Sequence, residues 1–571
     1  MICLQGVSVK HHLSNVYSSS RILSGANRAQ RIQWRPWGVA AFAEASDLDK
    51  PIFLVLSTSW SQRCHLLDKI ALSKRSVARE INRRYIPIRV DAERRPDISR
   101  RYLLHGWPTV AILAPEGEAI ALRNLLPADR MLGFLKEFSA LYKTRGRELR
   151  ARAQRALCDS YALEFFSQSP RGRGRESDPG KSRSASALKD AAWITGLLIN
   201  SYDRRSGSFR EKRALPNPAA IELLLKSSRK GRPELLEMAA NILDKMAAGL
   251  HDPTEGGFYR CSLTPTWKFP SPEKLLGANA DLISAYLLAY RLMRERNYLD
   301  MALRSIDFVE KRLGSAGTDR TSAAGGFFAS SATIQGLRSE SAAEKSAETR
   351  AVCTPFGIIS ENTERKNSTG LSGRLVDETI FTDWNCRMAD AYFDAYLATR
   401  DSRYLERALR LLDFLWEKCF EPELGMAHYI ADGRSALFGQ LEDQAWAIKA
   451  FARAAAITGE RGHVARAIEI FDVAAANLFD CGSFFDAPIE FETAAPMRIR
   501  LRTTVGNSIM ARALALLFSI SGDERYLDFA EDILATIGPE SSLSLHELAE
   551  YALSCFEVSE SFARVPRRRA A

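Results

Sequence analysis

The sequence lacks any two cysteines in close spacing. Disulfide frameworks of secreted proteins usually contain an even number of cysteines at short, regular intervals. This chain has an odd total of nine, at Cys3, Cys64, Cys158, Cys261, Cys353, Cys386, Cys419, Cys481 and Cys555. We therefore expect free thiols in a reducing compartment and predict a cytoplasmic location.

The first 43 residues lack Asp and Glu, although they carry several arginines and the run Ser18–Ser20. Such a composition is compatible with an organelle transit peptide. A disordered start over residues 1–26 explains it more simply. Residues 2–9 are interrupted by Gln, Gly and Ser, which disfavours a secretory signal. Import by a transit segment therefore stays an alternative to an unprocessed cytoplasmic chain.

A long hydrophobic run is also missing. The longest apolar pieces are short, such as ALALLF at residues 513–518, whereas a membrane-spanning helix needs about 20 apolar residues. Apolar residues make up 46% of the chain and charged residues 26%, as in ordinary globular proteins. We therefore expect no membrane partner.

Positive charge predominates, with a formal net charge of +10. Much of the excess lies in segments 143–147, 167–186 and 564–569, and Gly, Ser and Pro are frequent there. Flexible basic segments bind polyanions weakly and without sequence preference. The charge thus indicates solvated linkers and tails, and we predict no specific nucleic-acid partner.

At 571 residues the chain should divide into at least two domains. From Trp37 to Tyr142, helical and strand patterns alternate. The expected order is helix 38–46, strand 51–56, helix 64–85 in two pieces joined near Lys74, strand 86–90, helix 97–104, strands 109–114 and 118–123, and helix 129–142. This order, with the last two strands in a hairpin, is that of the thioredoxin fold.

The turn after the first strand reads Ser61-Gln-Arg-Cys64 and contains one sulfur where thioredoxin-type proteins carry two. A serine hydroxyl at the attacking position cannot replace a thiolate, so we expect no ordinary dithiol turnover. The helix start should favour a Cys64 thiolate, and Pro108 should be a cis-proline facing the loop. Cys64 is left as a structural or regulatory thiol, a site of reversible modification, or an apolar filler.

The second region, residues 187–559, is nearly all helical by periodicity. Helices are expected at 221–225, 235–250, 282–293, 298–313, 388–399, 404–420, 444–458, 464–479, 507–521 and 526–537. A glycine-aromatic signal recurs between helix pairs, at 207–209, 256–259, 325–328, 425–429 and 482–486. Such repetition indicates a helical array. We predict that it closes into an (α/α)6 toroid around a central cavity, with an open superhelix as the alternative.

Several motifs together resemble the spermatogenesis-associated protein 20 family. They include QWRPWG at 33–38, VDAERRPD at 90–97, GWP at 106–108, GGFYR at 256–260, TDWN at 382–385, LEDQA at 441–445 and GNS at 506–508. The resemblance implies a thioredoxin-like domain followed by a toroid related to six-hairpin glycosidases and N-acylglucosamine epimerases. The chain departs from the family pattern at Ser61, where members carry Cys, and at Ser271, where they carry His. Acidic residues usual after the third Gly-Gly-Phe signal are missing from 329–334.

The toroid holds the candidate chemistry. We name Glu273, Glu442 and Asp443 as candidate acid and base residues for glycoside hydrolysis or sugar epimerisation. The candidate ligand-binding residues are Trp267, Trp384, Trp446, Asn385 and Asn507. The simpler reading is that Glu442 and Asp443 favour a helix N-terminus and that the tryptophans are core residues.

The sequence thus predicts a multidomain protein, α/β plus all-α. The predicted order is a disordered start (1–26), a thioredoxin-like domain (27–145), a basic helix and linker (146–186), a six-hairpin glycosidase-like toroid (187–559) and a basic tail (560–571). The leading hypothesis is a domain with a degenerate loop joined to a toroid that binds a carbohydrate-like molecule, with a protein partner considered at the thioredoxin-like domain. A sugar enzyme and a monothiol redox protein are the alternatives. No cofactor or metal is predicted.

Overall fold

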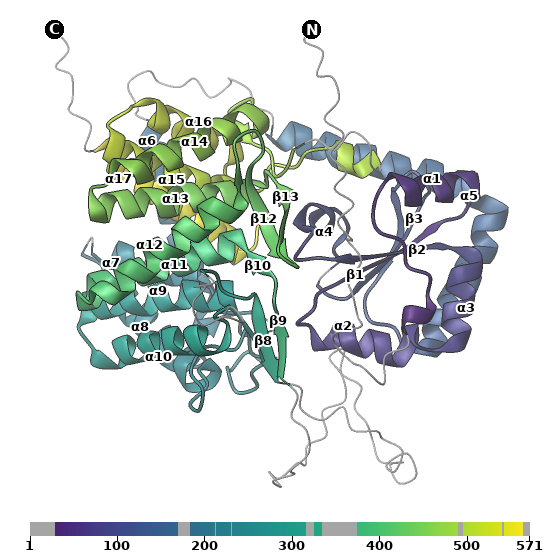
Figure 1. The fold of residues 1–571 in the computed structure, drawn as a ribbon, viewed down its shortest axis with the longest axis horizontal. Coiled ribbons are helices and arrows are strands. Elements are labelled where there is room, and N and C mark those ends of the chain that lie inside the picture. The colour runs from purple at the N-terminus through teal and green to yellow at the C-terminus, as the bar shows by residue number, and fades with distance from the viewer. Residues whose placement is uncertain are drawn as a thin grey trace.

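Figure 1 shows the computed structural model, in which an α/β domain lies beside a larger body of helices. The structure describes residues 29–104, 106–168, 183–211, 213–229, 231–315, 325–333, 374–488, 495–539 and 542–563. Most of segment 315–376, the N-terminal segment 1–26 and most of the tail fall outside the described residues.

The α/β domain is built on a four-stranded sheet in the order β2-β1-β3-β4, in which only β1 and β2 are parallel. Its elements are η2 (Ala29–Arg31), α1 (Val39–Asp47), β1 (Ile52–Ser57), α2 (Gln62–Leu67), η3 (Asp68–Leu72), α3 (Arg75–Arg84), β2 (Ile86–Asp91), α4 (Pro96–Tyr102), β3 (Thr109–Leu113), β4 (Ala119–Arg123) and the first part of α5 (Ala128–Gln168). The predicted thioredoxin-like fold is confirmed.

Both faces of this sheet are covered, which is why strand β1 is apolar throughout. Phe53 and Val55 face α3 and α5, whereas Leu54 and Leu56 face α1 and α4. The helical stretch after the loop is broken at Lys74, the extended residue before α3. The expected division into two helical pieces is therefore confirmed.

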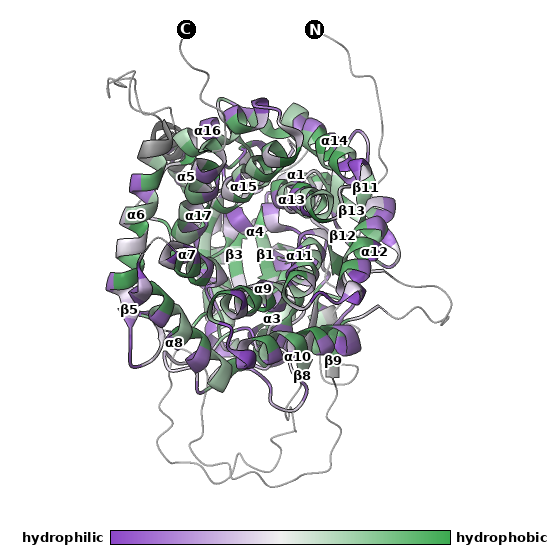
Figure 2. Ribbon diagram, turned by 90° about the vertical axis from the view of Figure 1, so that its left-hand side faces the viewer, coloured by the Kyte–Doolittle hydropathy of each residue, from purple (hydrophilic) through white to green (hydrophobic). Residues whose placement is uncertain are grey.

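The helical body is a closed ring of six hairpins. Each inner helix contacts the next, and the last inner helix, α17, contacts the first, α7. The inner helices are α7 (Pro218–Ser228), α9 (Leu276–Met293), α11 (Thr382–Thr399), α13 (Leu441–Thr458), α15 (Thr504–Ser521) and α17 (Leu545–Phe562). The outer helices are α6 (Arg183–Ser201), α8 (Pro233–Leu250), α10 (Arg296–Arg312), α12 (Ser402–Cys419), α14 (Arg461–Leu478) and α16 (Arg525–Ile537). Figure 2 looks into this ring and confirms the (α/α)6 toroid.

Short strands lie between the helices of the ring, and those labelled in Figure 1 are at the end that faces the thioredoxin-like domain. They are β5 (Tyr202–Asp203), β6 (Ser208–Phe209), β7 (Glu273–Leu275), β8 (Ser330–Thr333), β9 (Arg374–Asp377), β10 (Ile380–Phe381), β11 (Phe420–Glu421), β12 (Gly425–Ala431), β13 (Arg434–Phe438), β14 (Phe479–Asp480) and β15 (Ser483–Phe484). The glycine-aromatic signals fall on these hairpins and on the turns beside them. Among the described helices, α15 alone has the length and composition of a membrane span, yet 61% of it is buried, as expected for a core helix of the ring.

Candidate functional site

The degenerate loop, which carries Ser61 and Cys64, shields the Cys64 sulfur from solvent. Cys64 is 1% exposed, and the Thr58 backbone N–H points at its Sγ from 3.5 Å. Burial raises the pKa of the Cys64 thiol to about 11, so the expectation of a helix-stabilised thiolate is corrected. Ser61 is buried at the N-cap of α2. The Trp107–Pro108 bond is cis, in agreement with the prediction for Pro108.

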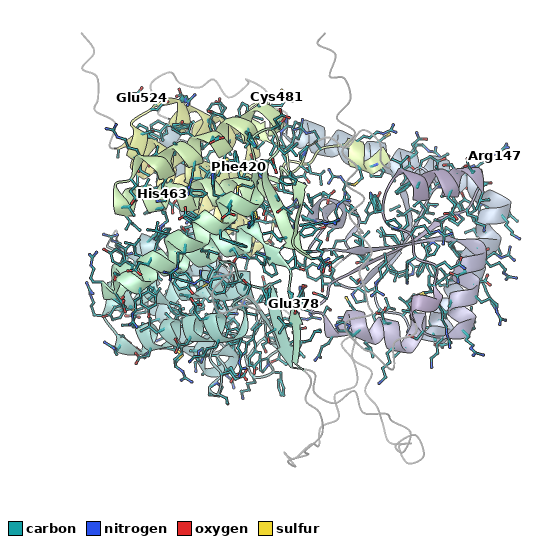
Figure 3. The ribbon with its side chains drawn as sticks, in the orientation of Figure 1. Arg147, Glu378, Phe420, His463, Cys481 and Glu524 are labelled. Atoms are coloured by element: carbon teal, nitrogen blue, oxygen red, sulfur yellow. The ribbon has the colours of Figure 1, made fainter. Side chains whose placement is uncertain are left out.

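The face of this loop is covered by the chain's own toroid. The Ser59 hydroxyl donates to the carboxylate of Asp377, which ends β9. The guanidinium of Arg260 lies 4.7 Å from the ring centre of Trp60, a geometry that favours a cation–π contact. Figure 3 labels Glu378, the neighbour of Asp377, at this boundary. A separate partner at the loop would therefore have to displace the toroid.

Two arginines of the thioredoxin-like domain anchor it to the ring. Arg100 forms an ion pair with Glu442 at 2.6 Å, and Arg101 forms one with Asp486 at 3.2 Å. Arg101 also donates to the carbonyls of Pro496 and Ile499. Burial opposes ionisation of Glu442, but Arg100 and Arg387 together lower its pKa. Glu442, a predicted catalytic residue, is thus held as a docking carboxylate.

His428 joins the other predicted carboxylate of α13 to the thioredoxin-like domain. Its Nδ1 lies 2.8 Å from an oxygen of Asp443, and its Nε2 lies 2.8 Å from the backbone carbonyl of Glu93. A carbonyl oxygen only accepts, so Nε2 carries a proton. Burial disfavours the imidazolium, but the charge and hydrogen bond of Asp443 outweigh it and raise the pKa of His428 to about 9.

The same cluster has the residue types of a metal centre. Asp383, His428 and Asp443 can bring one ligand atom each within 4.8 Å of one another. However, both ring nitrogens of His428 already have partners, and Asp443 also accepts the backbone N–H of Asp383 at 3.1 Å. The geometry therefore fits a hydrogen-bonded ion pair better than a metal site.

Three carboxyl groups in this interface have raised pKa values. Burial, reinforced by Asp91 and Asp383, raises the pKa of Glu93 to about 8. Burial also raises the pKa of Asp383 to about 7 and that of Asp91 to about 6. Burial, which disfavours the charged form, is the main cause of all three shifts.

Glu273, the third predicted catalytic residue, lies apart from the other two. It opens β7, is 4% exposed, and its Oε2 has no hydrogen-bond partner among the described residues. Its charge acts on His65 of the degenerate loop. The structure thus places all three predicted carboxylates beneath the thioredoxin-like domain, and none of them lines the central cavity described below.

The predicted asparagines clamp hairpins to helices. The Asn385 side chain accepts the Phe327 N–H at 2.8 Å and donates to the Phe327 carbonyl at 3.1 Å. Asn507 binds both backbone groups of Phe484 in the same way. Each amide also donates to the carbonyl four residues earlier. Since both residues are fully buried and their amides are occupied, they are not placed to bind a ligand.

This clamp repeats around the ring. Asn279 binds both backbone groups of Phe258, and Gln444 binds those of Met426. In all four cases the amide is the fourth residue of an inner helix and grips a glycine-aromatic hairpin or turn. After four of the five signals, the inner helix that follows carries Asn or Gln as its fourth residue, a regularity that was present in the sequence.

The predicted tryptophans take core positions. Trp267 is 3% exposed and its Nε1 donates to the carbonyl of Gly207 at 3.1 Å. Trp384 contacts Phe381, with ring centres 4.9 Å apart. Neither lines the central cavity, whereas Trp446 does.

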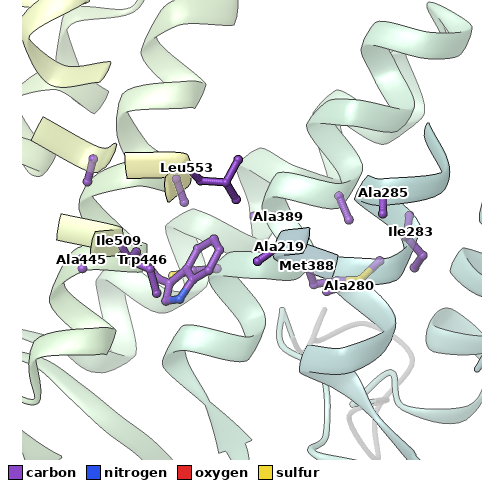
Figure 4. Packing of buried hydrophobic residues seen from close by; sticks show 14 of the residues in the cluster. Ala219, Ala280, Ile283, Ala285, Met388, Ala389, Ala445, Trp446, Ile509 and Leu553 are labelled. Carbon is purple, nitrogen blue, oxygen red and sulfur yellow. The ribbon is translucent and has the colours of Figure 1, made fainter. Parts of the chain in front are cut away.

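The centre of the toroid contains a cavity of about 310 Å³ lined by residues from all six inner helices. Its charged residues balance in number: Glu222, Asp281, Asp390, Asp394, Glu550 and Glu557 against Lys226, Arg291, Arg387, Lys449, Arg453 and Arg512. Most of them pair, as Lys449 does with Asp390 at 2.7 Å and Arg512 with Glu222 at 2.8 Å. Figure 4 shows the indole of Trp446 among the buried side chains of the ring helices.

Three lining groups keep a polar atom without a hydrogen-bond partner among the described residues. They are Trp446 Nε1, Arg387 Nε and Asp390 Oδ1, all shielded from solvent. Buried polar atoms are rarely left unpaired, because their desolvation costs about 1–3 kcal/mol each. Three residues that line one cavity therefore each carry an unpaired polar atom, two of them donors and one an acceptor.

These features define the class of protein: a thioredoxin-like domain with a degenerate loop, docked onto a six-hairpin toroid. Residues 13–159 match the family Thioredox_DsbH, described as "Protein of unknown function, DUF255". The chain is 28% identical over 300 residues to an uncharacterized protein of Caenorhabditis elegans, covering 49% of this chain and 39% of that protein. It is 26% identical over 302 residues to human spermatogenesis-associated protein 20, covering 49% of this chain and 37% of that protein. The predicted resemblance to that family is confirmed, and the match spans well under half of each relative.

Among solved structures, the chain is similar to a cellobiose 2-epimerase from Spirochaeta thermophila. The identity is 14% and the TM-score 0.49, over 66% of this chain and 98% of that one. The assignment of the toroid rests on the closed ring of helices described above.

Proposed function

We propose that the protein binds a small polyhydroxylated, carbohydrate-like molecule in the central cavity of its toroid. The observation that carries this proposal is the trio of unpartnered atoms on Trp446, Arg387 and Asp390. A hydroxyl group both donates and accepts, so a ring of hydroxyls complements two donors and one acceptor. Balanced lining charges disfavour a strongly ionic ligand.

The size of the cavity supports a single small ring. Ligand pockets usually measure about 300–1,000 Å³, and this cavity lies at the lower limit of that range. The indole of Trp446 is already contacted by Arg387 at 4.8 Å and Lys449 at 4.3 Å. Trp446 therefore contributes its N–H rather than an open stacking face.

In this proposal the thioredoxin-like domain is a fixed cap without dithiol chemistry. Its only loop thiol is buried and its loop contacts the toroid through Ser59 and Trp60. All seven described cysteines are free, which supports the proposed cytoplasmic location.

Calorimetric titration of the full chain with a panel of monosaccharides and disaccharides tests the proposal. Trp446→Phe removes the N–H but keeps an aromatic ring, and we expect about tenfold weaker binding from the loss of one hydrogen bond. Trp384→Phe, outside the cavity, is the matched control and should bind as the wild type does. No binding at millimolar sugar, or equal losses in both variants, would contradict the proposal.

A catalytic version of this proposal assigns the acid role to Asp281. Asp281 lines the cavity, and burial raises its pKa although Arg387 lies 3.1 Å away. A carboxyl group whose pKa is raised toward the working pH is suited to general acid catalysis. Turnover of the sugars by the wild type, lost in Asp281→Asn and kept in Glu442→Gln, would support it; loss in Glu442→Gln alone would restore the original assignment.

A further inference from the structure

A second hollow lies on the thioredoxin-like domain. It is a groove of about 630 Å³ between η2 and α3. Figure 1 places α3 at the edge of this domain that is remote from the toroid. The lining residues are Arg31, Gln33, Arg75, Ala78, Arg79, Asn82 and Arg83.

The arginines of α3 form one row along the groove. Arg75, Arg79 and Arg83 recur at every fourth position, so they share one face of the helix. Eight residues of α-helix rise about 12 Å. The groove therefore presents an elongated row of guanidinium groups, and Arg75, Arg79 and Arg83 are all exposed.

Two of the three arginines in this row lack compensating negative charge. No Asp or Glu lines the groove. The one acid of α3, Glu80, pairs with Arg83 at 2.8 Å and with Arg84 at 3.8 Å. Arg75 and Arg79 form no ion pair with any described residue. Like charges four residues apart destabilise a helix by about 0.2–0.5 kcal/mol per pair, a cost that a bound anion would remove.

The walls of the groove are fixed to each other. The side chain of Asn82 accepts the Gln33 N–H at 2.9 Å and donates to the Arg31 carbonyl at 2.9 Å. Ala78, 3% exposed, forms the floor. The spacing between the arginine row and the opposite wall is therefore set by the fold.

We propose that this groove binds a linear chain of phosphate groups. Guanidinium groups match phosphate oxygens in bidentate geometry. A row about 12 Å long can contact several successive phosphates of one chain. No aromatic residue lines the groove, so the site offers no stacking platform for bases. Recognition is limited to the phosphate chain, whether it belongs to a nucleic-acid strand or to inorganic polyphosphate.

Fluorescence anisotropy on the full chain tests this site, with a labelled short oligo(dT) as probe and linear polyphosphate as competitor. We expect Arg75→Gln/Arg79→Gln to weaken binding at least tenfold at 50 mM salt. Each lost contact to a single strand lowers the slope of log K against log salt by about 0.7, so the double variant should lose about 1.4. If polyphosphate displaces the oligo(dT), the groove recognises the phosphate chain that both molecules contain. The one that binds more tightly indicates whether a nucleic-acid strand or inorganic polyphosphate is the preferred ligand.

The matched control removes the same charge elsewhere in the domain. Arg130 and Arg147 are exposed on α5, outside the groove, and form no ion pair with any described residue; Figure 3 labels Arg147. Arg130→Gln/Arg147→Gln should keep the wild-type affinity, and thermal unfolding verifies that both double variants fold. The proposal is overturned if the two variants lose affinity equally, if the wild type does not bind at low salt, or if an oligo-glutamate peptide competes as well as polyphosphate.

Discussion

The inner helices of the toroid carry carboxylates in two regions with opposite surroundings. In the central cavity each acid has a basic neighbour available, and pairs such as Lys449–Asp390 and Arg453–Asp394 are 2.7 Å apart. At the interface with the thioredoxin-like domain, burial dominates instead. It raises the pKa of Asp383 to about 7, although Arg387 lies 3.0 Å away, and that of Glu93, on the thioredoxin-like side, to about 8.

The comparison teaches that residue type and helix position do not reveal what a carboxylate does. Glu442 and Asp443 begin an inner helix and resemble catalytic residues, yet they dock a neighbouring domain. Asp281 and Asp390, further along their helices, line the cavity instead. What distinguishes the two groups is the partner across from them, which belongs to a distant part of the chain.

The most damaging change to the interface should be Arg101→Ala. It leaves the fully buried carboxylate of Asp486 without its closest cation and two backbone carbonyls without a donor. Breaking a buried pair costs about 3–5 kcal/mol. We expect a large drop in the unfolding midpoint and faster proteolysis between the domains. Arg145→Ala, in an exposed pair with Glu148, is the control and should change little. Equal effects would mean that the interface is not anchored there.

Removing one amide clamp of the ring should cause the next largest loss of stability. Asn385→Ala leaves the backbone N–H and carbonyl of Phe327 buried and unpaired, at about 1–3 kcal/mol for each group. Asn507→Ala should cost the same, because its contacts are the same. Asn297→Ala, at an exposed position, is the control. Chemical denaturation measures all three, and a harmless Asn385→Ala would refute the clamp.

The pH dependence of the free energy of unfolding should be set by ionisable groups at the domain interface rather than by those that line the central cavity. Because the pKa of His428 is raised to about 9, its protonation stabilises the folded protein. This stabilisation is fully present below about pH 6.5 and is lost as the pH rises through 9. Glu93 retains its proton up to about pH 8, whereas the unfolded chain releases it earlier, so stability also falls over that range. We expect a loss on the order of 1–3 kcal/mol from pH 6.5 to 9.

The unfolding midpoint measured across this range tests the sign. His428→Gln keeps a donor for the Glu93 carbonyl but cannot ionise, so it should flatten the upper part of the profile. A midpoint that rises with pH, or an unchanged profile in the variant, would contradict the assignment.

The smallest effect is expected at the degenerate loop. With its pKa raised to about 11, Cys64 should alkylate on the order of a hundredfold more slowly than an exposed thiol such as Cys158. Mass spectrometry of peptides alkylated under native conditions measures this ratio. Cys64→Ala should leave insulin reduction unchanged at background level. Rapid alkylation, or reduction that depends on Cys64, would revive the monothiol hypothesis.

Local patterns sufficed for most of the fold. Apolar runs such as residues 51–56 gave the strands of the thioredoxin-like domain, and periodicity gave ten of the twelve ring helices. The two that were missed, α6 and α17, close the ring. A capping box at Ser544 and Glu547 marks the start of α17, so that signal was present in the sequence.

The candidate site was less predictable because its contacts are remote in sequence. Arg100 and Glu442 are 342 positions apart, and His428 binds a carbonyl 335 positions away. No local pattern reveals that one domain would neutralise carboxylates of another. The cavity wall around Trp446 likewise arises only when six helices meet.

The amide clamps also bear on how this architecture can change. Each clamp grips main-chain atoms alone, so it is indifferent to which side chains the gripped hairpin displays toward the neighbouring domain. The side chains of those hairpins can therefore change in evolution while the toroid keeps its shape. A toroid of this kind can acquire a new docking partner through substitutions in its hairpins, and its central cavity stays unchanged.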